Sequence, residues 1–357
     1  MSSQAKPRPI RSTFSDPASR YFRLTSVISS SPRADGAISE AKRTTLLSLG
    51  GVAIPANRPG GRVARVPRNR NWGSSARKGV ESAKLKDRLR FAFASCQHFG
   101  QGYFTAYQAM MEETSISSWI SVTNPGGRVR QHLPEPITLE DYRNLHALYE
   151  TDPHLQAAHA WHPFAVTWDD HEVHDDYADD QSMDLMPVED FLRRRAAAYQ
   201  AYYEHMPLRR RPIGPAMTLY RTLTFGDLAP FVMLDNRQYR SDQACQGPLY
   251  GAQLIEDCAE RESLDRMVLG PKQERWMLDQ LSGAKTHWRV TGQQALMAQL
   301  DQKQGAGKAF RSDGWDGYPA ARQRILNHIK DHNIENCVVL GGRPSVLLGD
   351  GSQGRLQ

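Results

Sequence analysis

The chain has 357 residues, of which 39% are hydrophobic and 24% charged, a composition typical of folded globular proteins. No run approaches the roughly 18 apolar residues of a membrane span, and four scattered cysteines are too few for a disulfide scaffold. The formal net charge of +6 is uneven, because residues 1–90 hold 19 Lys and Arg against 5 Asp and Glu, whereas the rest holds 26 against 34.

Residues 1–87 are rich in Ser, Pro, Arg and Gly and show no sustained periodicity, which predicts a basic, disordered leader. Its most apolar stretch, residues 44–56 (TTLLSLGGVAIPA), is interpreted either as the core of an export signal or as part of that leader. Localisation therefore stays undetermined from the residues alone. A basic arm also allows nucleic-acid binding as an alternative function, although the leader lacks interleaved aromatic residues and a known reader motif.

From residue 88 onward, short apolar runs predict strands, and apolar residues at helical spacing predict helices. Because the two types alternate, the chain is expected to form an α/β layered fold. The strands are expected at residues 89–94, 164–168, 219–225, 231–234, 287–292 and 337–340, with a turn at Gly226 and Asp227 between the third and fourth. The helices are expected at residues 103–113, 138–160, 191–203, 272–281 and 320–332.

The densest chemical signal is the run DDHEVHDDYADD at residues 169–180, which holds seven carboxylates and two histidines. It directly follows a predicted strand, and sites in α/β sheets form in loops beyond the carboxyl ends of strands. Crowded carboxylates are costly unless cations neutralise them, and carboxylates with imidazole suit metals that act on phosphate oxygens. The run therefore predicts a metal site at Asp169, Asp170 and His171. The alternative is a solvated acidic loop, which is the expectation for its last two aspartates.

Cys96 follows the predicted strand at residues 89–94. A thiolate at a strand end can be a soft metal ligand or a nucleophile, whereas the plainer interpretation is a small buried residue. The residues alone leave both open.

Arg237 and Arg240, in the segment DNRQYR, follow the predicted strand at residues 231–234. A guanidinium group there could hold a phosphate through two parallel hydrogen bonds. The alternative is a pair of exposed loop arginines that pair with Asp235 or Asp242.

Six segments taken in order resemble the alkaline phosphatase D (PhoD-like) metallophosphatase family. The resemblance covers about residues 88–342 and implies a four-layer α/β/β/α sandwich around a metal cluster that hydrolyses phosphate mono- and diesters. Residues 88–357 are accordingly interpreted as an incomplete PhoD-like domain. The segments are FAFASCQ (91–97), DYRNLHALYETDPHLQAAHA (141–160), TWDDHEV (167–173), LDNRQYRSDQ (234–243), GPKQERWMLDQL (270–281) and WDGYPAARQRIL (315–326).

The resemblance also implies roles for individual residues. It makes Cys96 an iron-type ligand and Asp169 or Asp170 a calcium- or iron-type ligand. Family members tend to carry Asn where this chain has Asp175 and Asp176, so Asp175 is expected to supply a ligand oxygen. His171 is expected beside the metals and Arg237 at the phosphate, as catalytic residues. The implied cofactors are calcium and iron.

The implied substrate is a phosphate ester. Nucleic acid is expected to bind only as a phosphodiester substrate. The chain is expected to be a monomer without a membrane span, and relatives of this family are expected in the periplasm or outside the cell.

The chain departs from the family pattern in two stretches. Residues 114–124 read TSISSWISVTN and hold no acidic residue, where the family has a strand ending in Gly-Asp. The last residues read LGGRPSVLLGDGSQGRLQ, where the family has Leu-Gly-Gly-Asp-Val-His. A shifted reading frame would permit the family residues in both stretches, a hypothesis that resequencing tests. Fewer anionic ligands predict impaired activity, and the alternative is a non-catalytic relic that binds a cation or phosphate.

Overall fold

The computed structural model describes residues 89, 91–95, 97, 99, 103–112, 135–246, 251–342 and 355–356. The leader at residues 1–87, Cys96 and the departing stretch at residues 114–124 lie outside the described residues. The predictions made for them therefore stay predictions.

The central element is a four-stranded sheet in the order β1-β2-β4-β7. Strands β1 (Arg221–Phe225) and β2 (Ala229–Met233) are antiparallel. Gly226 adopts a positive φ of 55° in the turn between them, which confirms the predicted strand pair and its turn. Strand β4 (Arg289–Gly292) runs parallel to β2, and β7 (Cys337–Leu340) runs parallel to β4, as expected for strands joined through helices.

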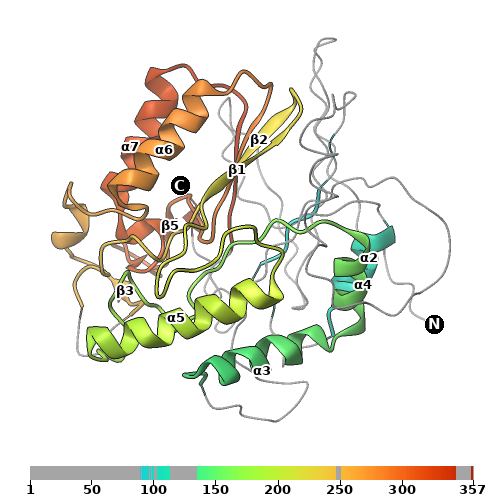
Figure 1. Cartoon of the computed structure of the whole chain (residues 1–357). Coiled ribbons are helices and arrows are strands. Elements are labelled where there is room, and N and C mark those ends of the chain that lie inside the picture. Colours follow the sequence, from blue (N-terminus) through green and yellow to red (C-terminus); the bar gives the residue numbers. More distant parts are fainter. Residues whose placement is uncertain are drawn as a thin grey trace, which may run out of the picture.

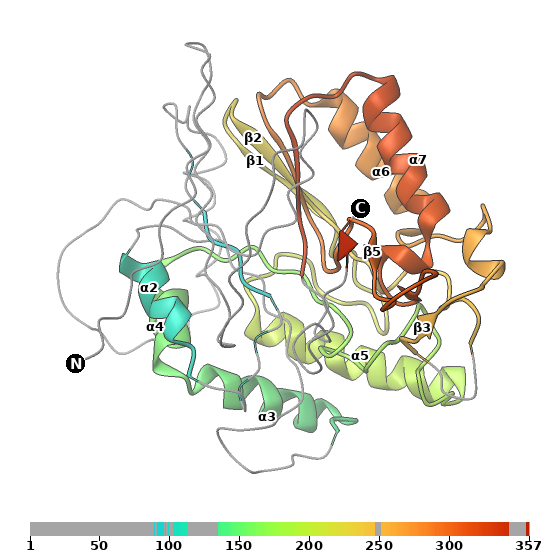
Figure 2. The same cartoon turned by 180° about the vertical axis from the view of Figure 1, so that it is seen from behind.

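Helices α6 (Gly270–Gly283) and α7 (Pro319–Asp331) lie side by side over one face of this sheet (Figure 1). Alternate strand residues point toward them, so Val232 and Val339 share one buried cluster with Met277 and Ile325 of the two helices. The same arrangement is seen from behind in Figure 2.

The opposite face of the sheet packs on two buried segments, residues 91–95 and 164–168. Phe91 and Ala165 face the sheet and join Phe231 in one cluster, whereas Val166 faces the helices on the far side and joins a second cluster. The order is therefore a helix layer, the sheet, the buried segments and a second helix layer. This arrangement confirms the mixed α/β fold class.

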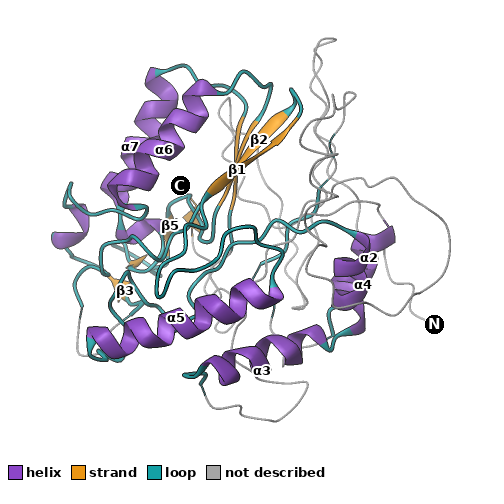
Figure 3. Ribbon diagram, viewed as in Figure 1, coloured by secondary structure: helices purple, strands orange, loops and turns teal. Residues whose placement is uncertain are grey.

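The second helix layer contains α3 (Leu139–Glu150), α4 (Pro153–Trp161) and α5 (Val188–His205), with α2 (Thr105–Glu112) against α4 (Figure 3). Thr138 and Asp141 form a capping box at the start of α3, and Asp152 caps α4, where Pro153 occupies the first helical position. All five predicted helical regions are thus helical. In the described part of the chain, no helix is both long and apolar enough to cross a bilayer.

Two predicted strands, residues 89–94 and 164–168, are not strands in the described part of the chain. Their described residues are mostly buried, as predicted, and side chains donate hydrogen bonds to backbone carbonyl oxygens of the second segment. Arg221 donates to the carbonyl oxygen of Val166, and Gln294 donates to that of Trp168. Apolar runs predict burial more directly than they predict a hydrogen-bonded ladder.

Two small sheets were not predicted, because their strands are only two residues long. Strand β3 (Leu254–Ile255) pairs with β6 (Phe310–Arg311), and β5 (Leu300–Asp301) pairs with β8 (Arg355–Leu356), both antiparallel. Short 3-10 helices lie near them at Glu260–Glu262 and Trp315–Gly317.

Candidate metal centre

The acidic run forms a tight turn at its start. The backbone amide of Asp169 donates to the Glu172 carboxylate at 2.8 Å. The amides of Val173 and His174 donate to the carbonyl oxygen of Asp170. The Asp170 carboxylate in turn accepts from the amide of Asp176 at 3.0 Å. These bonds fold the run back on itself, so its first residues are a structured turn rather than an extended solvated loop.

This turn brings three of the predicted site residues together. One donor atom each from Asp170, His171 and Asp175 lies within 4.8 Å of the others, and Nε2 of His171 is 3.3 Å from Oδ1 of Asp175. Asp170 is buried, and the other two are partly exposed. Carboxylate oxygens and imidazole are ligands for hard and borderline cations, so the donor set fits a metal ion.

Burial and crowding set the charges of this turn. Burial raises the pKa of Asp169 to about 6 and that of Asp176 to about 7, and neighbouring carboxylates add to both shifts. For Asp170, burial is outweighed by Arg237 and His171, which lower its pKa. The pKa of His171 is raised, since Asp170 and Asp175 outweigh its burial. The turn therefore crowds several carboxyl groups together, and a bound cation would favour their charged forms.

Arg237 is buried, with its side chain 4% exposed. Its Nε donates to Asp169 at 2.6 Å, and Nη1 and Nη2 donate to the two carboxylate oxygens of Asp313 at 2.8 and 2.7 Å. Nη2 also lies 3.5 Å from Oδ2 of Asp170. The interpretation of Arg237 as an exposed loop arginine is therefore wrong, since its side chain is buried among the acidic residues of the site.

Arg240 is also buried, and it contacts the same carboxylate of Asp313. Its Nη1 donates to Asp313 at 3.1 Å, and its guanidinium group lies over the Tyr318 ring. Gln243 donates to the same carboxylate at 2.9 Å and to the carbonyl oxygen of Asp176 at 2.7 Å. The segment DNRQYR therefore contacts the acidic turn directly through Arg237, and both of its arginines also contact Asp313, which is distant in the sequence.

Sequence reasoning missed Asp313. It lies 76 residues after Arg237 and outside any run of charge, although it stands two residues before the segment WDGYPAARQRIL. That proximity to a family-like segment was the only available signal. Its pKa is well below the ordinary range, because Arg237 and Arg240 outweigh the effect of burial.

A second group with closely spaced donor atoms consists of Glu135, His174 and Asp184. Nδ1 of His174 is 2.6 Å from Glu135, and Nε2 is 2.6 Å from Asp184. Arg194 also donates to Glu135 at 2.7 Å. This second group is therefore a hydrogen-bonded network, in which Arg194 forms an ion pair with Glu135 and His174 contacts the carboxylates of Glu135 and Asp184.

Gln294, just after β4, holds the base of the site together. Its Nε2 donates to Oγ1 of Thr167 and to the carbonyl oxygens of Trp168 and Leu234. The start of the acidic turn is consequently held beside the carboxyl ends of β2 and β4, where loops of α/β folds form sites.

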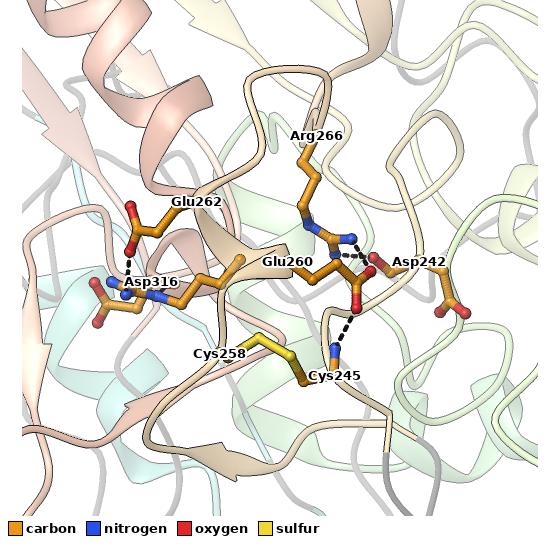
Figure 4. The surroundings of a disulfide bond; sticks show 8 residues. Asp242, Cys245, Cys258, Glu260, Glu262, Arg266 and Asp316 are labelled. Carbon is orange, nitrogen blue, oxygen red and sulfur yellow. Dashed lines mark hydrogen bonds and ion pairs between the residues drawn. A yellow bond between two sulfur atoms is a disulfide. The ribbon is translucent and has the colours of Figure 1, made fainter.

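The loop that carries Arg240 and Gln243 is tied to a disulfide bond between Cys245 and Cys258 (Figure 4). Glu260 accepts a hydrogen bond from the amide of Cys245 at 2.8 Å and one from Arg266 at 2.7 Å. Four cysteines do not make a disulfide scaffold, but two of them crosslink the chain just after Arg240 and Gln243.

A family model for PhoD-like phosphatase matches residues 91–343 of the chain. The chain belongs to the PhoD-like phosphatase family. The family expected from the six segments is thus confirmed over most of the described residues.

Alkaline phosphatase D of Bacillus subtilis (strain 168) is 46% identical to this PhoD-like chain over 268 residues, which cover 71% of the chain and 45% of that protein. A solved structure described as the structure of PhoD matches with a TM-score of 0.64 and 45% identity, over 71% of this chain and 50% of that one. The chain therefore spans about half the length of the relatives that it matches.

Proposed function

We propose that this PhoD-like chain hydrolyses phosphate mono- and diesters with the help of metal ions. The observation that carries the proposal is the convergence of Asp170, His171 and Asp175 in one turn of the fold. The match to the PhoD-like phosphatase model over residues 91–343 supports phosphate esters as the substrate class.

In this proposal, Asp170 and Asp175 supply oxygen ligands and His171 supplies an imidazole nitrogen. Asp169, also expected from the sequence to be a metal ligand, lies outside this group of closely spaced donor atoms. A bound cation supplies Lewis-acid polarisation of the phosphoryl oxygens. Asp169 adds negative charge beside the ligands, and its bond to Arg237 fixes its carboxylate. Arg237 is proposed to lie beside the phosphate, where its buried positive charge would offset part of the substrate's negative charge.

The identity of the metals extends this proposal. Calcium suits the carboxylates of Asp170 and Asp175, and iron suits an imidazole or thiolate ligand. Cys96 is proposed as the thiolate ligand of the iron, from its place in the segment FAFASCQ.

We further propose that the activity of the chain as written is impaired. Residues 114–124 offer hydroxyl oxygens but no carboxylate, and neutral oxygens offset clustered positive charge less well than aspartate does. Activity near background is the expectation, and it should recover when the family residues are rebuilt in this stretch and at the C-terminal end. A chain that stays inactive after rebuilding is the non-catalytic relic of the alternative interpretation.

The test is hydrolysis of 4-nitrophenyl phosphate and of bis(4-nitrophenyl) phosphate by the rebuilt chain, with calcium and iron supplied. Turnover of both esters that is lost in chelator and in the Asp170→Asn variant supports the proposal. Asp331→Asn, at the far end of α7, is the matched control and should retain the activity. Turnover that is equal in Asp170→Asn would contradict it.

A further inference from the structure

Asp313 is the one carboxylate that both arginines of the segment DNRQYR contact within the described residues. It accepts hydrogen bonds from both terminal nitrogens of Arg237, from one terminal nitrogen of Arg240 and from the side-chain amide of Gln243. Its side chain is 14% exposed, and Asp313 is absent from the group of donor atoms close enough to hold a cation. A buried carboxylate with this many charged donors holds its partners in one geometry.

The directions of the three Arg237 nitrogens show what this geometry does. Nε donates a hydrogen bond to Asp169, and Nη1 and Nη2 donate hydrogen bonds to Asp313. Asp170 is left with a 3.5 Å ion-pair contact to Nη2 and no hydrogen bond from Arg237 within the described residues. A free guanidinium fork beside Asp170 would instead bind that carboxylate through two hydrogen bonds, as Arg does with carboxylates generally.

We propose that Asp313 is a positioning residue that keeps the terminal nitrogens of Arg237 away from Asp170, so that Asp170 stays available to a cation. The inference rests on the proposed function, because it needs the cation to bind at Asp170, His171 and Asp175. It adds a role for a residue outside the ligand set. Without the negative charge of Asp313, Arg237 turns its fork to Asp170 and competes with the cation for the same oxygens.

The experiment measures calcium binding by isothermal titration calorimetry with calcium chloride alone on chelator-stripped protein. Asp313→Asn is expected to weaken calcium binding by about tenfold or more, because a guanidinium group then competes at short range for Asp170. Asp316→Asn is the matched control, since Asp316 is also buried and pairs with Arg322 at 2.6 Å outside the acidic turn. It is expected to lower thermal stability but to leave the calcium affinity within about threefold.

A second comparison tests whether Asp313 acts by positioning Arg237 or acts directly on the cation. It remains informative even where the single variant Asp313→Asn does not fold. Calcium binding by Arg237→Gln is compared with binding by Arg237→Gln combined with Asp313→Asn. Because Asp313 is proposed to act through Arg237, the two should agree within about threefold. A further loss of about tenfold in the double variant would show that Asp313 acts on the ion directly, and it would overturn the inference.

The outcomes distinguish the inference from the function on which it rests. Equal calcium binding by the unchanged chain and by Asp313→Asn overturns the inference and leaves the proposed function standing. Absence of calcium binding by the unchanged chain, or unchanged binding in Asp170→Asn, overturns the proposed metal centre and the inference with it.

Discussion

Arg237 and Asp313 face each other with two parallel hydrogen bonds, from Nη1 to Oδ1 at 2.8 Å and from Nη2 to Oδ2 at 2.7 Å. The pair joins the loop after β2 to the segment before α7. With the bond from Nε to Asp169, one guanidinium group connects three parts of the chain. A buried network of this kind is costly to break, because each lost partner leaves an uncompensated charge.

Arg237→Met should therefore destabilise the chelator-stripped protein by about 3 kcal/mol, measured by urea unfolding. Calcium should recover part of this loss, since a cation replaces the missing positive charge beside Asp169 and Asp170. Arg143→Met is the control, because its pair with Glu204 is partly exposed and screened by solvent, so its loss is expected to cost much less. Equal losses in the two variants would contradict the network.

The disulfide between Cys245 and Cys258 should stabilise the fold. It closes a loop with a sequence separation of 13, for which about 3 kcal/mol is expected from the constraint on the unfolded chain. Replacing both cysteines by serine should lower the free energy of unfolding by that amount, whereas Cys337→Ser, at the free cysteine, should change it little. A loss as large in Cys337→Ser would contradict a specific role for the disulfide.

The buried His146 should make stability fall in mild acid. Burial lowers its pKa to about 3, and nearby His205 adds to the shift. The unfolded chain binds a proton at His146 near pH 6.5, while the folded chain does not. The contribution of the neutral His146 to the free energy of unfolding is therefore complete above pH 6.5. It is lost as the pH falls toward 3, by about 2 kcal/mol at pH 5.

Urea unfolding at pH 7.5 and pH 5 measures this difference. His146→Leu should lose less stability between the two pH values than the unchanged chain, by about 2 kcal/mol. An equal loss in both proteins would assign the acid sensitivity to other groups.

The capping box of α3 gives a local prediction. Oγ1 of Thr138 accepts from the amide of Asp141, and the Asp141 carboxylate accepts from the amide of Thr138 at 2.8 Å. Thr138→Ala should lower the free energy of unfolding by about 1 kcal/mol. Thr138→Ser retains the hydroxyl and should lose much less, so equal losses would show that the cap is not the cause.

Helical spacing was enough to predict the helices, because each packs one apolar face on a buried cluster, as Met277 of α6 and Ile325 of α7 do. The strand pair β1 and β2 was also predictable, since Gly226 marks the turn. The described residues of the segments 89–94 and 164–168 are mostly buried, as the sequence predicts, but residues 91–94 and 164–168 do not form the predicted strands. An apolar run shows that a segment is buried and does not show which backbone groups contact it.

Part of the candidate site was also open to sequence reasoning. Asp170, His171 and Asp175 lie within one turn, so a local run of charge was a sufficient signal. Asp313 and the pairing of Cys245 with Cys258 were not predictable in this way, because chain folding brings their partners together. Cysteine spacing alone does not determine connectivity, and a single aspartate carries no local pattern.

The most direct test of the metal centre is the Tm of chelator-stripped protein as calcium or iron is returned. Bound cations stabilise by mass action, by about 2.7 kcal/mol at one hundred times the dissociation constant, so the Tm of the unchanged chain should rise by about 5 °C. Asp170→Asn and Asp175→Asn should abolish most of that rise. A Tm that does not respond to either cation, or that rises equally in the two variants, would contradict a metal centre formed by Asp170, His171 and Asp175.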